Sequence, residues 1–300
     1  MKKILVILVL NLLALSLFAQ EWIGIGSPKP TSPKVALLSE TSDEITVHFQ
    51  LGGYYINKVE TPRGEAAFIT VPKMASLLEE GAPDLPLFAI PVAIGNTAEM
   101  SVEVASAQYK EVQGVEIAPS KGNFSREIDP ETVPYRYGEA YTKNAFYPSM
   151  QASLDYPYIL RDVRGQNILV YPFAYNPVTK VLRVYTEMTL IMHKISDNGE
   201  NLKVARRGAV KLAPETEAMY ANRFVNYREK ASKYNFFPDE GETMVICSEQ
   251  YMAAMQPYVD WKNQSGRPTT MYSLAEAGGN NYESIKSFIL GHYDNPSENL

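Results

Sequence analysis

The sequence predicts a mainly β, sandwich-like domain followed by the beginning of an α/β domain. The 300 residues contain 20 tyrosines and 20 prolines. Tyrosine favours strands, whereas proline is excluded from helix interiors and from central strands. Apolar and polar residues alternate through much of the first two thirds of the chain, which is the period of half-buried strands. After about residue 240 the apolar pattern changes to strand, helix, strand, helix, which begins a parallel sheet.

The first residues have the layout of a secretory signal peptide. Lys2 and Lys3 precede an apolar run from Ile4 to Phe18, and Ala19 offers a small residue for cleavage. A membrane-spanning helix needs about 20 apolar residues, and this run is shorter. We therefore expect residues 1–19 to be removed and the protein to be secreted, outside the cell or at its surface, without a stable membrane span. A retained N-terminal anchor is the alternative.

The composition argues against nucleic-acid binding, an internal disulfide and a metal site. The formal net charge is −6, and nucleic-acid binding would require basic clusters, so we expect no nucleic-acid partner. Cys247 is the only cysteine, so the exported fold has no internal disulfide. The three histidines, His48, His193 and His292, have no metal-ligand spacing with each other or with Cys247, and we expect no metal site or cofactor in this chain.

Short strands follow one another after an extended leader over residues 21–34. The segment between Pro72 and Gly81 is consistent with one or two helical turns, and a loop rich in proline and glycine follows it. The predicted strands cover residues 44–51, 54–59, 66–71, 87–94, 100–105 and 112–117.

The clearest hairpin covers residues 167–193. Residues 168–175 alternate, residues 176–179 (Asn-Pro-Val-Thr) turn, and residues 180–192 return. An Asn-Pro pair initiates turns because proline presets φ for the second turn position. We interpret the tyrosines of both strands as cross-strand packing residues.

A polar linker separates the two predicted domains. We place a β-rich domain at residues 20–205, the linker at 206–240 and the α/β unit at 241–300. In the last of these, strands are expected near 243–247 and 267–272, and helices near 251–263 and 282–293. Two parallel strands cannot cover their own edges and faces, so we expect this unit to be truncated.

Two stretches carry a resemblance to a known family. The first contains YGEAYTKNAFYP, LRDVRGQNILVYPFAYNP and VTKVLRVYT, between residues 137 and 186. The second covers residues 244–278, where a strand leads to a helix that ends in a WK-x-x-x-G signature, here Trp261, Lys262 and Gly266. In this order, behind a signal peptide, they resemble the pro-region and the opening of the catalytic domain of gingipain-type (family C25) cysteine peptidases.

This resemblance implies a secreted cysteine endopeptidase zymogen. Its β-rich pro-domain would keep the enzyme latent and assist its folding, and the pro-domain's partner would be its own catalytic domain. The catalytic domain would be caspase-like, with a His and Cys dyad that acts on protein or peptide substrates. No residue of this chain matches the dyad, so we expect the catalytic residues beyond residue 300 and the chain itself to be inactive. A secreted, non-enzymatic β-sandwich adhesion or binding module is the alternative function.

The loop between Pro119 and Pro130 is the candidate inhibitory segment. A basic side chain suits an acidic specificity pocket because it forms charge-assisted hydrogen bonds there, and Lys121 or Arg126 can supply one. An ordinary solvated loop is the alternative. Exposed polar linkers concentrate proteolytic nicking, so the candidate processing sites, besides Ala19 for the signal peptide, are Arg206, Arg207 and Arg228.

Two other sets of residues have a structural explanation that we prefer. Cys247 ends an apolar strand, and free cysteine is among the most buried residue types, so we expect it in the core and not as a nucleophile. Asp129, Glu131 and Glu139 are interleaved with prolines and predict a solvated loop. Calcium binding in the full-length enzyme is the alternative for these carboxylates, although no EF-hand spacing is present.

Overall fold

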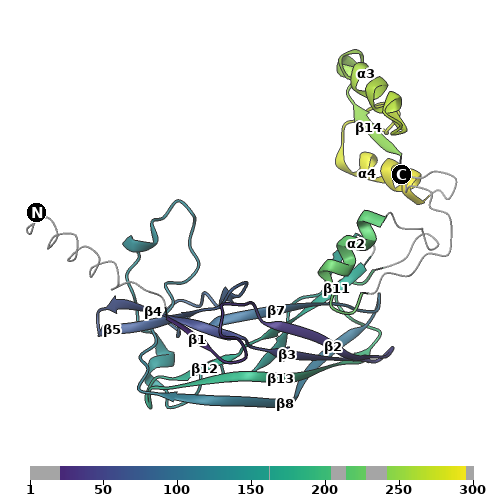
Figure 1. Ribbon diagram of the computed structural model, residues 1–300. Helices are drawn as coiled ribbons and strands as arrows, with labels where there is room; N and C mark the ends of the chain where they lie inside the picture. Colours follow the sequence, from purple (N-terminus) through teal and green to yellow (C-terminus); the bar gives the residue numbers. More distant parts are fainter. Residues whose placement is uncertain (1–20, 162, 204–213, 228–241, 295–300) are drawn as a thin grey trace, which may run out of the picture. The chain divides into compact units, whose positions relative to one another are not determined.

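The computed structural model describes residues 21–161, 163–203, 214–227 and 242–294 (Figure 1). By contacts the chain divides into two units. The β unit contains the chain up to Lys203 and also Asn222–Tyr227, and the α/β unit contains the rest. Among the described residues, no helix is long and apolar enough to cross a membrane.

The largest sheet of the β unit is built around one long strand, β13 (Val181–Ser196). Strand β8 (Glu99–Gln113) pairs with it along its whole length, and β12 (Phe173–Asn176) and β3 (Glu44–Gln50) follow one another along its other edge. Strand β2 (Lys34–Glu40) pairs with β3. All of these pairings are antiparallel. The two strands predicted at residues 100–105 and 112–117 are wrong, because β8 runs without a break from Glu99 to Gln113.

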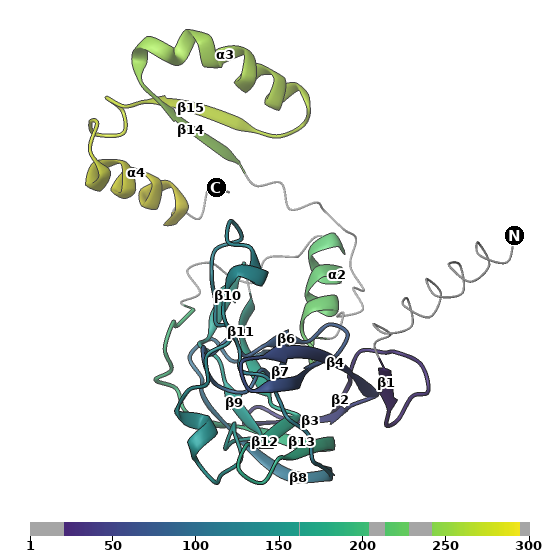
Figure 2. The same ribbon diagram turned by 90° about the vertical axis from the view of Figure 1, so that its left-hand side faces the viewer.

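A second antiparallel sheet lies on the opposite side of the core (Figures 1 and 2). Its central strands are β7 (Pro86–Ala93) and β11 (Val163–Val170), which β6 (Ala75–Ser76), β9 (Ala152–Leu154) and β10 (Tyr158–Leu160) extend. A third sheet consists of β1 (Glu21–Gly24), β4 (Gly53–Thr61) and β5 (Gly64–Thr70). The prediction of a mainly β domain is confirmed.

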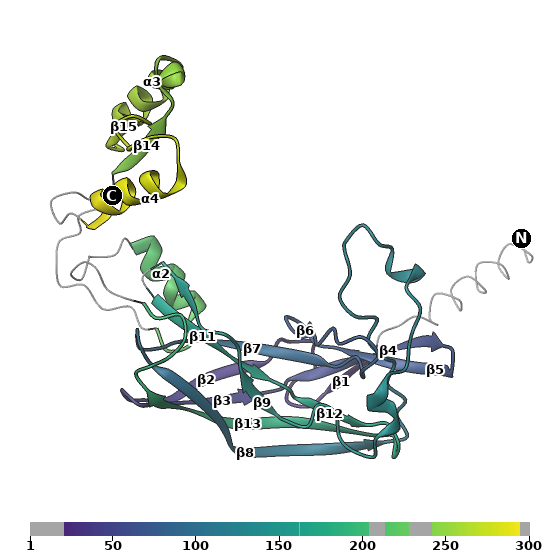
Figure 3. The same cartoon turned by 180° about the vertical axis from the view of Figure 1, so that it is seen from behind.

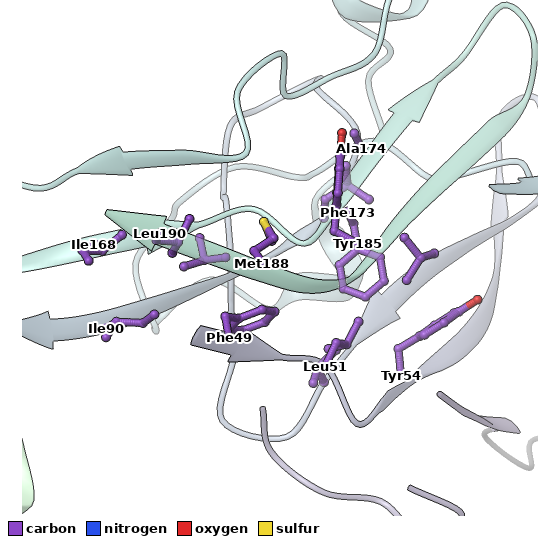
Figure 4. Close-up of a cluster of buried hydrophobic side chains, with 14 of the residues drawn as sticks. Phe49, Leu51, Tyr54, Ile90, Ile168, Phe173, Ala174, Tyr185, Met188 and Leu190 are labelled. Carbon is purple, nitrogen blue, oxygen red and sulfur yellow. The ribbon is translucent and has the colours of Figure 1, made fainter. Parts of the chain in front are cut away.

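Apolar side chains from all three sheets fill the space between them (Figure 4). Phe49 of β3 contacts Phe88 of β7, with ring centroids 5.8 Å apart, and Tyr54 of β4 contacts Phe173 of β12 edge to face at 5.4 Å. Burying a side chain of this size stabilises a fold by about 2 kcal/mol, and edge-to-face aromatic pairs add to that. This core is what holds the β unit together.

The predicted continuous strand over residues 168–175 is wrong. It is two strands, because β11 ends at Val170 and pairs with β7, whereas β12 begins at Phe173 and pairs with β13. The chain changes sheets at Pro172, which has no N–H to donate to a ladder. The turn at residues 176–179 and the return strand lie where they were predicted.

The predicted helical turns over residues 74–80 are also wrong. Lys73 and Leu78 have φ values of 63° and 55°, in the left-handed region that a right-handed helix excludes. Instead, residues 75–76 form β6 on the edge of β7, and Leu77 donates its N–H to the Leu85 carbonyl. The expected leader likewise contains a strand, because β1 pairs with β4.

The α/β unit has two parallel strands, β14 (Thr243–Cys247) and β15 (Thr269–Ser273). Helix α3 (Glu249–Gln264) connects them, and α4 (Tyr282–Asp294) follows. A further helix, α2 (Pro214–Arg223), precedes β14 in the sequence. The two strands and the helices α3 and α4 begin and end within two residues of the predicted positions.

Candidate functional site

A long segment between β8 and β9 leaves the sheets of the β unit. Figures 1 and 3 show part of it, in teal, as an open loop that stands away from the strands. We call residues 121–136 the projecting loop, and the residues on either side of it, 115–120 and 137–147, its base. The predicted inhibitory loop, residues 119–130, covers the last residues of the ascending base and most of the projecting loop.

The ascending side of the base is tightly bound to the β unit. Ala118 donates its backbone N–H to the Ala67 carbonyl of β5 (2.7 Å), and Ser120 donates to the Ala82 carbonyl (2.7 Å). Ile117, Ala118 and Ser120 are at most 2% exposed. Because buried backbone groups must keep their hydrogen bonds, this side of the base has a defined conformation.

The descending side of the base closes against the ascending side and against Gly81, which lies between β6 and β7 and donates its N–H to the Ser120 carbonyl (3.0 Å). Gly138 donates its N–H to the Gly81 carbonyl (2.9 Å), and a methyl group at either position would lie within 3.1 Å of the other glycine's backbone. Tyr141 donates its hydroxyl proton to the Ile117 carbonyl (2.8 Å). Burial raises the pKa of Tyr141, so it remains a neutral donor. The loop therefore starts and ends at a single rigid point.

Side-chain contacts brace this closure. The Arg63 guanidinium lies over the Tyr137 ring, 3.9 Å from its centroid, and the Tyr137 hydroxyl is 2.8 Å from the Thr61 hydroxyl. Arg136 pairs with Glu80 at 3.2 Å. Both partners of this ion pair are exposed, and such pairs contribute little, so the cation–π and hydroxyl contacts are the stronger braces.

The tip of the projecting loop is a tight turn. Ile128 donates its N–H to the Ser125 carbonyl (3.0 Å), which leaves Arg126 and Glu127 at the two central turn positions. Arg126, Glu127 and Ile128 are exposed. Asp129 then caps a 3-10 helix, η2 (Pro130–Thr132). A second 3-10 helix, η3 (Glu139–Thr142), lies in the base.

The two candidate inhibitory residues differ in the contacts that their side chains make. The Lys121 ammonium donates to the Pro130 carbonyl (2.7 Å) and lies 4.4 Å from the centroid of the Tyr135 ring. It therefore ties the two sides of the projecting loop together. Arg126 is exposed, and its side chain makes no hydrogen bond or ion pair with the residues that the structure describes. Of the two, Arg126 is the one available to a partner.

The carboxylates of Asp129 and Glu139 bind groups of the protein itself. The Asp129 carboxylate accepts from the Glu131 N–H (2.9 Å), and Glu139 pairs with Lys143 at 2.8 Å. Across the described ranges, no group of three or more His, Cys, Asp or Glu residues is placed to hold a metal ion. The calcium alternative for Asp129, Glu131 and Glu139 stays a prediction.

Cys247 is less buried than predicted. It is half-buried, as are all five residues of β14, because this sheet has only two strands within the described residues. Its thiol lies 3.3 Å from the Ser248 carbonyl oxygen. His48 and His193 lie on β3 and β13 of the β unit, and His292 lies on α4.

The candidate processing residues Ala19, Arg206, Arg207 and Arg228 lie outside the described residues, and these assignments stay predictions. The base of the projecting loop was not predicted from the sequence. The sequence places Gly81 in a loop and Gly138 in the YGEAYTKNAFYP motif, but only the structure shows that the two glycines pack against each other.

The chain matches the Propeptide_C25 family over residues 28–218. It is 37% identical over 274 residues to gingipain R1 of Porphyromonas gingivalis and 35% identical over 275 residues to gingipain R2 of the same organism. Both alignments cover 90% of this chain but only 27% and 36% of the relatives. The chain therefore spans about a third of the length of these relatives, or less.

The fold is also similar to that of a solved structure, a complex of Porphyromonas gingivalis RgpB pro- and mature domains. The TM-score is 0.58 and the sequence identity 36%, and the match covers 66% of this chain and 100% of the matched chain.

Proposed function

This chain belongs to the C25 propeptide family, and on that premise we propose that its β unit is the pro-domain that holds a cysteine peptidase precursor latent. In this proposal the α/β unit begins the caspase-like catalytic domain, and a part of the precursor that this chain does not contain supplies the His and Cys dyad. The β unit's partner is then its own catalytic domain, and the substrates are proteins or peptides.

We assign latency to the projecting loop, which enters the substrate cleft of the catalytic domain. The observation that carries this assignment is an exposed Arg126, unpaired among the described residues, at the tip of a loop whose two ends meet at one rigid point. A loop that is already ordered loses less conformational entropy when it binds, which favours tight inhibition.

Arg126 is our choice for the residue that fills the specificity pocket. Its guanidinium can pair with a carboxylate through two parallel hydrogen bonds. Lys121 would first have to give up its bond to the Pro130 carbonyl. We assign Lys121 the supporting role of keeping the projecting loop in shape.

The same proposal covers secretion and folding. The basic and apolar N-terminal residues would direct export and be removed after Ala19, and the compact β unit would assist folding of the catalytic domain. Refolding yields of the catalytic domain with and without the β unit test the second point. Equal yields would contradict a folding role.

The inhibitory role is tested by titrating the mature peptidase with purified β-unit variants. Removing a buried, charge-paired anchor costs about 2–5 kcal/mol, so Arg126→Ala should raise the inhibition constant by roughly thirtyfold or more. Lys121→Ala should have a smaller effect, because the tip can still reach the pocket. Arg206→Ala and Arg207→Ala should leave the inhibition constant unchanged and slow processing instead.

Lys110→Ala is the matched control, since Lys110 is an exposed basic residue on β8, outside the projecting loop. If Arg126→Ala and Lys121→Ala both inhibit as well as the parent, the projecting loop is only a surface loop. Inhibition would then have to come from another part of the β unit.

A further inference from the structure

The chain leaves the β unit and then returns to it. Before the excursion, Lys203 donates its N–H to the Asn96 carbonyl (3.0 Å), just after the end of β7. After the excursion, residues 222–227 again belong to the β unit. Val225 then donates its N–H to the Pro91 carbonyl of β7 (3.0 Å). We call Phe224–Tyr227 the clasp.

The clasp covers an open stretch of strand edge. Residues 91–93 of β7 pair with β11 on one side, whereas β6 pairs only with residues 86–87 on the other. The backbone groups of Pro91 and Ala93 that point away from β11 are therefore free for another segment. An uncovered edge of this kind invites pairing with another chain, and the clasp occupies it.

Asn226 uses every polar group of its side chain, binding Ala93 on this edge and Glu40 at the end of β2. Its Oδ1 accepts from the Ala93 N–H (2.8 Å), and its Nδ2 donates to the Ala93 carbonyl (2.9 Å) and to the Glu40 carboxylate (2.7 Å). Asn226 is only 7% exposed. An amide offers one acceptor and two donors in this arrangement, which a carboxylate or an alkyl group cannot reproduce.

The buried Phe224 ring anchors the clasp by packing closely against Tyr158 and Gly165. Its side chain is 1% exposed, and its ring stacks on that of Tyr158 with centroids 6.3 Å apart. A methyl group at Gly165 of β11 would lie 2.5 Å from a carbon of the Phe224 ring. Phe224 therefore needs a glycine at this position to reach its place.

From these contacts we propose that the clasp docks on β7 as a non-covalent peptide ligand of the β unit. Hydrolysis of a peptide bond at Arg206 or Arg207 by a peptidase and water then breaks the chain without separating the two sides. Hydrolysis beyond Tyr227, where Arg228 is the next residue, removes this attachment. The proposal does not require the β unit to be an inhibitor, and it is tested without any peptidase domain.

The test compares two versions of the 300-residue chain, each with one inserted recognition site for a sequence-specific protease. The first version is cut within residues 204–213, before the clasp, and the second within residues 228–241, after it. After complete cutting, gel filtration should show one species for the first version and two separate fragments for the second. If the fragments of the first version separate at once, the proposal is wrong.

Variants of the first version identify the contacts. Phe224→Ala should speed separation of the fragments by at least about thirtyfold, since truncating a buried phenylalanine is among the costliest substitutions. Asn226→Asp should also speed it, because the new carboxylate faces the Ala93 carbonyl and the Glu40 carboxylate. Gly165→Ala should speed separation as well, because its methyl group would displace the Phe224 ring. Asn222→Ala, an exposed neighbour, is the matched control and should change nothing.

Circular dichroism of each cut variant checks that the β unit is still folded. Phe224→Ala and Asn226→Asp change only the clasp, so they remain informative if Gly165→Ala fails to fold. If these two variants stay together as firmly as the parent, another contact holds the fragments and the clasp does not.

Discussion

The two units of the molecule differ in how completely they bury their apolar side chains. In the β unit a continuous cluster from three sheets is buried, including Phe49, Ile168 and Leu190, none of which is exposed to solvent. Within residues 242–294, the buried apolar side chains are those of Val259 and Ala277. The β unit has a core of its own, and the described part of the α/β unit has only the beginning of one.

The two helices that follow β14 also leave large aromatic side chains exposed to solvent. Tyr251 and Trp261 of α3 are 59% and 58% exposed, and Tyr282 of α4 is 75% exposed. Single exposed aromatic residues are normal, but a two-stranded sheet with uncovered helices does not support an independent fold. The β unit therefore has enough buried apolar surface to be stable alone, whereas residues 242–294 depend on further contacts.

The largest effect is expected when the two units are produced as separate fragments. A fragment of residues 21–227 should unfold cooperatively on heating and have a β-rich circular dichroism spectrum. A fragment of residues 242–300 should show no cooperative transition, because burial of so few apolar side chains does not offset the conformational entropy of folding. A monomeric 242–300 fragment with a sharp thermal transition would show that this part of the chain folds independently and contradict the prediction.

In each unit a polar side chain holds a loop through hydrogen bonds to its backbone, and the two side chains differ in burial. In the β unit, Arg164 is 1% exposed and donates to the carbonyls of Gly95, Ala98, Glu200 and Asn201 at 2.6–3.0 Å. In the α/β unit, Asn263 is exposed, and its side chain bonds both backbone groups of Thr269. Burial lowers the pKa of Arg164, yet arginine stays protonated in proteins.

We therefore predict unequal costs for removing these two braces. Arg164→Met should lower the free energy of unfolding of the β unit by about 4 kcal/mol, because it leaves four carbonyls without their buried donor. Asn263→Ala should cost about 1 kcal/mol or less, since water can replace an exposed amide. Urea unfolding measures the first, and hydrogen exchange of the Thr269 amide in the intact chain measures the second. Arg126→Ala, at an exposed site, is the control and should stay within about 0.5 kcal/mol of the parent.

Local patterns in the sequence predicted most of these elements. Alternation around Val47 and helical spacing around Val259 each depend on neighbours along one chain segment, and both were read correctly. Membership of the C25 propeptide family, inferred from motifs in both units, is confirmed by the family match. The assignment of the α/β unit as a caspase-like start stays a prediction.

What the sequence did not show are contacts between distant segments. Pro172 was placed within one strand, although the chain changes sheets there. The contact of Gly81 with Gly138 joins residues more than fifty positions apart. Phe224 and Asn226 lie in the predicted linker 206–240, because the residues around them are polar and the open edge of β7 that they cover cannot be seen from the sequence.

The two units also differ in how they hold a carboxylate. The Asp84 backbone N–H donates to the Ala118 carbonyl in the base of the projecting loop, and its buried Oδ1 has no hydrogen-bond partner among the described residues. Burial therefore raises the pKa of Asp84, although a hydrogen bond from Ser76 opposes the shift. Because the folded pKa lies above the unfolded one, this residue contributes stability at low pH that is lost as the pH rises through the folded pKa.

We predict that Asp84→Asn stabilises the β unit at pH 7, where the parent must keep a charged or protonated carboxyl in a buried place. The advantage should shrink as the pH falls and disappear below the unfolded pKa of about 4. Urea unfolding of parent and variant at pH 7 and pH 3.5 measures it. A variant that is less stable than the parent at neutral pH would contradict this sign.

Glu276 in the α/β unit should show the opposite sign, with a smaller effect. Its carboxylate accepts from the Ser273 N–H (2.7 Å) and from the Ser273 hydroxyl (2.9 Å), and these bonds lower its pKa. Stability from this residue is therefore present above the unfolded pKa and lost as the pH falls through the folded one. Glu276→Gln should speed hydrogen exchange of the Ser273 amide at pH 7 relative to the parent, and the difference should narrow toward pH 4. Glu283→Gln, at an exposed position in the first turn of α4, is the control, and equal exchange rates in all three proteins would show that the bond to Ser273 does not order this loop.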